Sequence, residues 1–80
     1  MTNSNMFKDI TYQSLNKQID GTHYREFKIQ PARFIIENNL LFPEASVIKY
    51  ICRHKKKGKE KDLQKAIHYI EMIIERDYSK

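Results

Sequence analysis

The chain has 80 residues, of which 15 are Lys or Arg and 10 are Asp or Glu, so its formal net charge at pH 7 is +5. That length allows one small domain at most. The single cysteine excludes an intramolecular disulfide, and no apolar run approaches the roughly 20 residues of a membrane-spanning helix. A core this small is marginal alone, so we expect a homo-oligomer in a reducing, intracellular setting, without a membrane partner.

In chain order, residues 1–20 are expected to form a flexible or partly helical N-terminal arm, and residues 21–80 a single helical domain. Residues 22–30 alternate loosely between polar and apolar side chains, which fits an extended segment or a loop. A first helix is predicted from Pro31, because proline suits the first turn of a helix. The pair Asn38 and Asn39 is predicted to end it.

A second helix is predicted to start at Phe42, with Pro43 and Glu44 in its first turn. We expect it to run to about Lys56 and to stop at Gly58. A third helix is predicted from Glu60 to about Asp77, because apolar residues recur at helical spacing over four turns (Leu63, Ala66/Ile67, Ile70 and Ile73/Ile74). The fold class is therefore all-α: a small three-helix domain with an irregular N-terminal arm and a C-terminal antiparallel helical hairpin.

Positive charge is concentrated in residues 47–61, which hold seven basic residues and one acidic residue. The resulting +6 exceeds the charge of the whole chain, so the rest of the protein is close to neutral. Such a segment favours partners that carry phosphate, such as nucleotides or nucleic acids. Helical spacing places Lys49, Arg53 and Lys56/Lys57 on one stripe, which is either a ligand-binding face or a solvated helix face.

Motifs for catalysis and for metals are missing from the sequence. Gly58 follows the lysines instead of preceding them, so the segment is no phosphate-binding P-loop. The three histidines and Cys52 match no zinc spacing, and no cofactor is expected. His68 on the third helix fits a solvated or interface position, and the sequence leaves open whether His68 and Asp62 have a functional role.

The chain nevertheless resembles a known family over residues 22–75. The motif elements are His23-Tyr24, Gln30-Pro31, Phe34-Ile35, Phe42, Ile48-Lys49-Tyr50, Arg53, Lys56-Lys57, Asp62-Leu63, Lys65-Ala66 and Tyr69. This pattern is similar to that of a family of small bacteriophage domains of unknown function, often labelled nucleotide kinase-like. Two positions depart from it: Ala45-Ser46 stands where the family commonly has Gly-Asn, and Lys57-Gly58 where it tends to have Asn-Gly.

The resemblance implies a phage protein in the host cytoplasm that binds a nucleotide or a nucleotide-type signal. Sequestering that ligand would be one way to counter a host defence. The residues carried over for phosphate are Lys49, Arg53, Lys56, Lys57 and His23, with Tyr24 and Tyr50 as candidates for stacking on a base. Tyr50 fits equally well as a buried contact between the helices.

Three functions remain open at this point. The first is a nucleotide binder without catalysis. The second is a module that binds nucleic acid or a host protein, which the dense basic segment suits. The third, implied by the resemblance, is a deoxynucleoside monophosphate kinase, which would need Mg²⁺ and two nucleotide sites.

Overall fold

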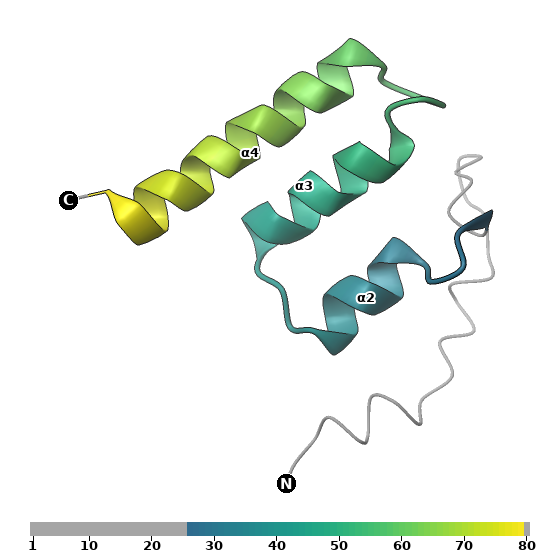
Figure 1. Ribbon diagram of the computed structural model, residues 1–80, viewed down its shortest axis with the longest axis horizontal. Coiled ribbons are helices and arrows are strands. Elements are labelled where there is room, and N and C mark those ends of the chain that lie inside the picture. The colour runs from purple at the N-terminus through teal and green to yellow at the C-terminus, as the bar shows by residue number, and fades with distance from the viewer. Residues whose placement is uncertain (1–25, 80) are drawn as a thin grey trace, which may run out of the picture. The chain divides into compact units, whose positions relative to one another are not determined.

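The computed structural model describes residues 26–79. This part of the chain contains three α-helices and no strand: α2 (Pro31–Glu37), α3 (Phe42–Arg53) and α4 (Glu60–Tyr78) (Figure 1). The predicted all-α class is confirmed for these residues. The chain divides into two units, Met1–Asn39 with α2 and Leu40–Lys80 with α3 and α4. The predicted arm over residues 1–20 lies outside the described residues.

Helix α2 begins and ends where the sequence predicts. Pro31 occupies its first turn and is buried, and Gln30 before it has the extended backbone that proline imposes on its predecessor. At the other end, the Asn38 side-chain amide donates a 2.9 Å hydrogen bond to the backbone oxygen of Phe34. Asn39 follows with φ 55°, a left-handed conformation that asparagine tolerates better than most residues, and this reversal stops the helix.

Helix α3 begins as predicted but ends earlier than predicted. Pro43 and Glu44 lie in its first turn, and its last residue is Arg53, so the expected continuation to Lys56 is wrong. Lys56 and Lys57 both donate backbone N–H bonds to the oxygen of Arg53, and Lys59 donates one of 2.8 Å to the oxygen of His54. These bonds close a turn over residues 54–59 in place of further α-helical turns. The lysine stripe on α3 is therefore shorter than the sequence suggests.

Helix α4 matches its prediction within one residue and is 19 residues long. Two acidic residues, Glu60 and Asp62, lie in its first turn, and Arg76 lies in its last turn, so the charges at both ends complement the helix dipole. Lys59 immediately before it has φ 54° and ψ −133°. The left-handed residue of this connection is thus Lys59 and not the neighbouring Gly58.

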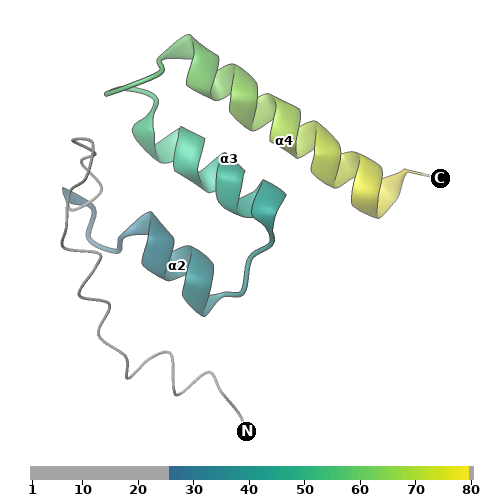
Figure 2. The ribbon, with the colours of Figure 1, turned by 180° about the vertical axis from the view of Figure 1, so that it is seen from behind.

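Helices α3 and α4 run antiparallel and lie side by side in both views of the ribbon (Figures 1 and 2). Their shared surface contains two small buried residues, Ser46 at 8% and Ala66 at 2% exposed. The Phe42 ring of α3 and the Tyr69 ring of α4 also meet edge to face, with their centroids 5.6 Å apart. Small side chains let the two helix backbones approach, and the aromatic rings fill the wider space beside them.

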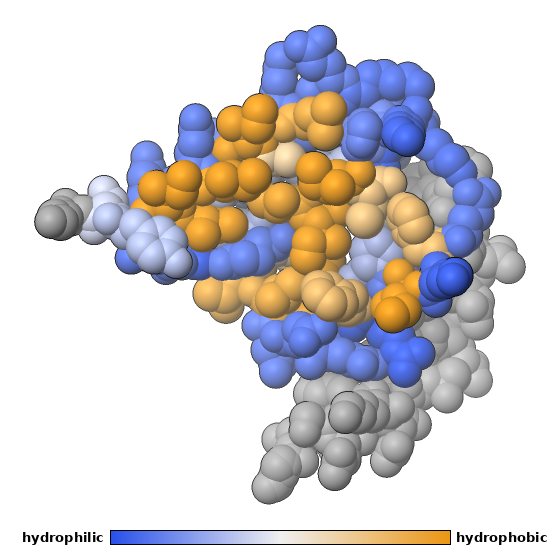
Figure 3. All heavy atoms as spheres, viewed as in Figure 1, coloured by the Kyte–Doolittle hydropathy of each residue, from blue (hydrophilic) through white to orange (hydrophobic). Residues whose placement is uncertain are grey.

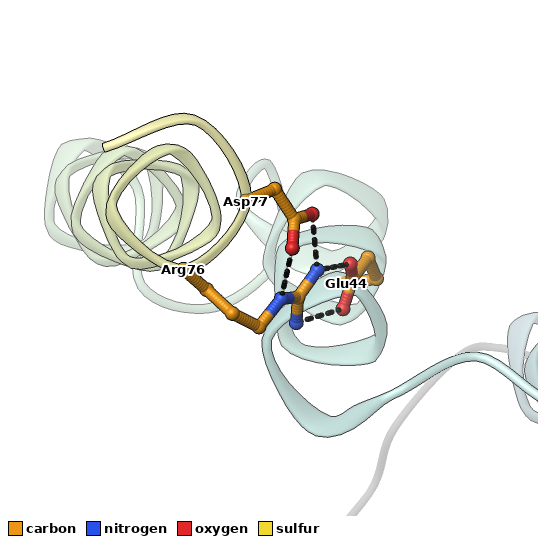
Figure 4. A network of polar contacts seen from close by, with 3 residues as sticks. All are labelled: Glu44, Arg76 and Asp77. Atoms are coloured by element: carbon orange, nitrogen blue, oxygen red, sulfur yellow. Dashed lines mark hydrogen bonds and ion pairs between the residues drawn. The ribbon is translucent and has the colours of Figure 1, made fainter. Parts of the chain in front are cut away.

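An ion-pair network joins α3 and α4 at the end of the helix pair that lies away from the connecting turn, which we call the open end (Figure 4). Arg76, near the end of α4, donates hydrogen bonds to both carboxylate oxygens of Glu44 in the first turn of α3. The same guanidinium bonds the adjacent Asp77, with both N–H···O distances at 2.8 Å. These contacts lower the pKa of Glu44 and of Asp77 and raise that of Arg76.

Much of the apolar surface of the described helices stays exposed. Among residues 40–79, which the structure describes in the second unit, the buried residues are Ser46, Asp62 and Ala66, so only Ala66 forms a fully buried apolar core. On α3, the apolar residue Ile51 is 50% exposed. None of the helices within residues 26–79 is long and apolar enough to span a membrane.

Candidate phosphate-binding site

Arg53 and Asp62 join α3 and α4 at the closed end of the helix pair, where the turn over residues 54–59 connects the two helices. Arg53 is the last residue of α3, and Asp62 lies in the first turn of α4. The Arg53 Nε donates a 2.9 Å hydrogen bond to Asp62 Oδ2, and its NH2 group donates a 3.1 Å bond to Oδ1. This two-pronged geometry is the one that arginine and a carboxylate form best.

The Asp62 carboxylate has a third donor, the backbone N–H of Gly58, at 3.0 Å from Oδ2. The Asp62 side chain is 1% exposed and that of Arg53 is 19% exposed. Hydrogen bonds from Arg53, followed by the one from Gly58, hold the pKa of Asp62 below its ordinary value despite burial. Asp62 therefore stays ionised and fixes both the turn and the arginine.

Three cationic groups surround the ring of Tyr50. The Lys49 Nζ lies 5.6 Å, the Arg53 Cζ 4.8 Å and the Lys65 Nζ 5.4 Å from the ring centroid. Each is within the range of a cation–π interaction. We call Lys49, Tyr50, Arg53 and Lys65 the Tyr50 cluster.

Tyr69 of α4 positions the Tyr50 ring. The two rings stack with centroids 6.1 Å apart and planes 12° from parallel. The centroid of the Tyr69 ring lies 5.8 Å from that of the His68 ring, and His68 itself is exposed. Tyr50 is thus a contact between the two helices and also the centre of the cation cluster, and its stacking on a base stays a prediction.

The structure brings together only some of the predicted phosphate ligands. Lys49 and Arg53 meet at Tyr50, whereas Lys56 and Lys57 lie exposed in the turn over residues 54–59. His23 and Tyr24 lie outside the described residues. Lys65 joins the cluster, although in the sequence it stands out only as part of the family pattern. The sequence does indicate this position, because Lys65 follows Asp62 by three residues. At that spacing the two side chains lie on neighbouring turns of α4.

The remaining lysines of the basic segment form an exposed group. Lys55, Lys56, Lys57, Lys59 and Lys61 are all exposed. Among them, the Lys59 Nζ donates a 2.6 Å hydrogen bond to the backbone oxygen of Lys55. Within residues 26–79, no group of three or more His, Cys, Asp and Glu side chains is arranged to hold a metal ion.

Comparison with protein families gives one match. A family model described as a protein of unknown function, DUF3310, matches residues 15–71, which is more than half of the chain. The chain belongs to the DUF3310 family. No curated protein and no solved structure matches it. The match confirms the expected relation to a family of unknown function, and its description names neither a source nor a ligand.

The DUF3310 match includes the whole Tyr50 cluster and Asp62. It also includes the two positions where the chain departs from the pattern considered above. Ser46, which stands in place of an asparagine there, is buried in α3. At the second position the departing residue is Lys57, which is exposed, whereas Gly58 matches the pattern and donates its backbone N–H to Asp62. Ser46 therefore serves the packing of the helix pair, and Gly58 serves its turn.

Proposed function

We propose that this protein binds a phosphate-bearing ligand, of nucleotide type, at the Tyr50 cluster. The observation that carries the proposal is the approach of Lys49, Arg53 and Lys65 to within 4.8–5.6 Å of one aromatic ring. Three cationic groups at one ring create a positive potential that attracts anionic groups. Asp62 is one such group, and a phosphate would be another.

The exposed lysines of the neighbouring turn support this assignment. They add to the positive potential around the cluster and would attract an anionic ligand from a distance, with a strong dependence on salt. The nucleotide character of the ligand rests on the family resemblance, as do a phage origin, a host-cytoplasm setting and a role in sequestering the ligand. Self-association is also part of the proposal, because one helix pair buries little apolar surface.

Binding without catalysis fits the cluster better than phosphoryl transfer. A kinase needs carboxylates that hold Mg²⁺. Asp62 is the carboxylate bonded to Arg53, and it already accepts three hydrogen bonds, from Arg53 and Gly58. Its negative charge is committed to the fold.

Calorimetric titration of the full chain with dTMP, dGMP, ATP and inorganic phosphate tests the proposal. At least one of these probes should bind, and the nucleotide should be recovered unchanged after incubation. Lys49→Gln and Lys65→Gln should each weaken binding about 10-fold or more, the loss expected for one charge-assisted hydrogen bond. Lys61→Gln is the matched control, since it removes the same charge from an exposed position of α4 outside the cluster.

Three results would contradict the proposal. The first is that no probe binds at millimolar concentration. The second is an equal loss of affinity in Lys65→Gln and Lys61→Gln, which would indicate a diffuse basic surface. In that case a single-stranded oligonucleotide, bound more tightly than ATP, would support the nucleic-acid module instead. The third is conversion of dTMP to its diphosphate with ATP, which would establish the kinase.

A further inference from the structure

One side of α4 is apolar and uncovered. Ile67, Ile70 and Ile74 follow each other at spacings of three and four residues, so they lie on the same side of the helix. They are 55%, 41% and 52% exposed. Figure 3 shows hydrophobic side chains gathered over α3 and α4 on one face. We call these three residues the isoleucine stripe.

The helix pair needs this stripe covered in order to be stable. Internal packing of α3 against α4 fully buries only Ala66 among the apolar side chains described in this unit. Domains of this size are marginal even with a complete core, and they commonly gain the missing apolar burial by association. Whatever covers the stripe must be present whenever the chain folds, and a second copy of the chain always meets this condition.

The charges of the unit are complementary between two copies. Helix α4 carries five acidic and three basic residues, whereas the turn over residues 54–59 carries four lysines and no acidic residue. Helical spacing places Glu60, Glu71 and Glu75 beside the isoleucine stripe on one flank. If this acidic flank of α4 in one copy lies beside the turn of another, acidic and basic surfaces meet twice, as a two-fold interface requires.

We propose that the isoleucine stripe and the adjoining surface of α3 form a homodimer interface. In this interface, the apolar face of one helix pair packs on the same face of a second copy, giving a four-helix arrangement. The interface uses none of the residues of the Tyr50 cluster, so it does not depend on the proposed ligand.

Sedimentation equilibrium and thermal unfolding of the full chain test this interface. The wild type should have the mass of two chains, and its Tm should rise with protein concentration because dissociation accompanies unfolding. Ile70→Glu places a charge in the stripe and should raise the dimer dissociation constant at least about 30-fold, as for an interface hot spot. The matched control is Met72→Glu, because Met72 is 39% exposed on the same helix but two residues away, on another side.

The decisive comparison is between the two glutamate variants. Ile70→Glu should sediment as one chain where Met72→Glu remains a dimer. If Ile70→Glu fails to fold, the wild type decides alone, since a Tm that stays constant over a hundredfold range of concentration would overturn the proposal. A wild type with the mass of one chain would also overturn it, and would indicate that another part of the chain or a different protein covers the stripe.

Discussion

Arg53 and Asp62, nine residues apart in sequence, join the end of α3 to the start of α4 through hydrogen bonds of 2.9 and 3.1 Å. The same arginine lies over the Tyr50 ring, so one guanidinium belongs both to the ion pair and to the cation cluster. The geometry of the candidate site therefore depends on the stability of this pair.

Replacing Asp62 with Asn should destabilise the protein more than any single change at the open end of the helix pair. The substitution removes the negative charge that accepts two hydrogen bonds from the largely buried Arg53, which costs more than the loss of an exposed ion pair. We expect Tm to fall by more than about 5 °C. Glu44→Gln, measured in parallel, should have a smaller effect, because its pair with Arg76 is more exposed and Asp77 still bonds that arginine. Thermal unfolding followed by circular dichroism makes the comparison, and an equal effect of both substitutions would contradict it.

The dependence of stability on pH should carry the signature of Asp62. Its pKa in the folded state is below the ordinary value of 3.8, so the ionised form favours folding. This contribution is complete above the ordinary pKa and is lost as the pH falls below it. Urea unfolding between pH 7 and pH 2 should therefore show a decline at the acid end that is shallower in Asp62→Asn. Some decline should remain in the variant, because the pKa values of Glu44 and Asp77 are lowered as well.

Gly58 should not tolerate a side chain. A Cβ atom at this position would lie 2.1–2.6 Å from three atoms of the Asp62 carboxylate group. The carboxylate would have to move, which breaks its bonds with Arg53 and with the Gly58 N–H. Gly58→Ala should therefore cost about 1–3 kcal/mol of the free energy of unfolding, in the range of other overpacked sites. In the double variant with Asp62→Asn the two effects should be less than additive, since both act on one contact.

Lys59 should accept glycine with a gain in stability. Its φ of 54° and ψ of −133° are unfavourable for a residue with a Cβ atom and are readily adopted by glycine. Lys59→Gly should therefore stabilise the protein by about 1 kcal/mol, reduced by loss of the Nζ bond to Lys55. Lys61→Gly in the first turn of α4 is the contrasting variant, and it should destabilise. Urea unfolding of both variants gives the comparison, and a loss of stability in Lys59→Gly would contradict the prediction.

The Tyr50 ring should matter more than its hydroxyl group. Tyr50→Phe keeps the stacking on Tyr69 and the ring face toward the cations, so its stability should change little. Tyr50→Leu removes both and should cost about 1–3 kcal/mol, the sum of one aromatic pair and its cation–π contacts. If Leu and Phe prove equally stable in urea unfolding, the cations do not contribute through the ring.

The secondary structure was largely predictable because its signals are local. The four-turn apolar period of α4, the prolines that open α2 and α3, and the asparagine pair that ends α2 each depend on neighbouring residues only. The end of α3 was not predictable in this way. Gly58 and the lysines before it fit a longer helix, whereas the chain leaves the helix after Arg53 so that the Gly58 N–H reaches a carboxylate on the next helix.

The candidate site was likewise predictable only where its features are local in the sequence. The sequence by itself determined that the chain is helical and that its positive charge is concentrated in residues 47–61, because composition and spacing are properties of the chain alone. Only the tertiary structure decided which cations act together. Lys65 meets Lys49 and Arg53 because α4 packs antiparallel on α3, while Lys56 and Lys57 remain in the turn. Likewise Asp62, in sequence an ordinary acid of a first helical turn, is the most buried side chain described, because packing places it under Arg53.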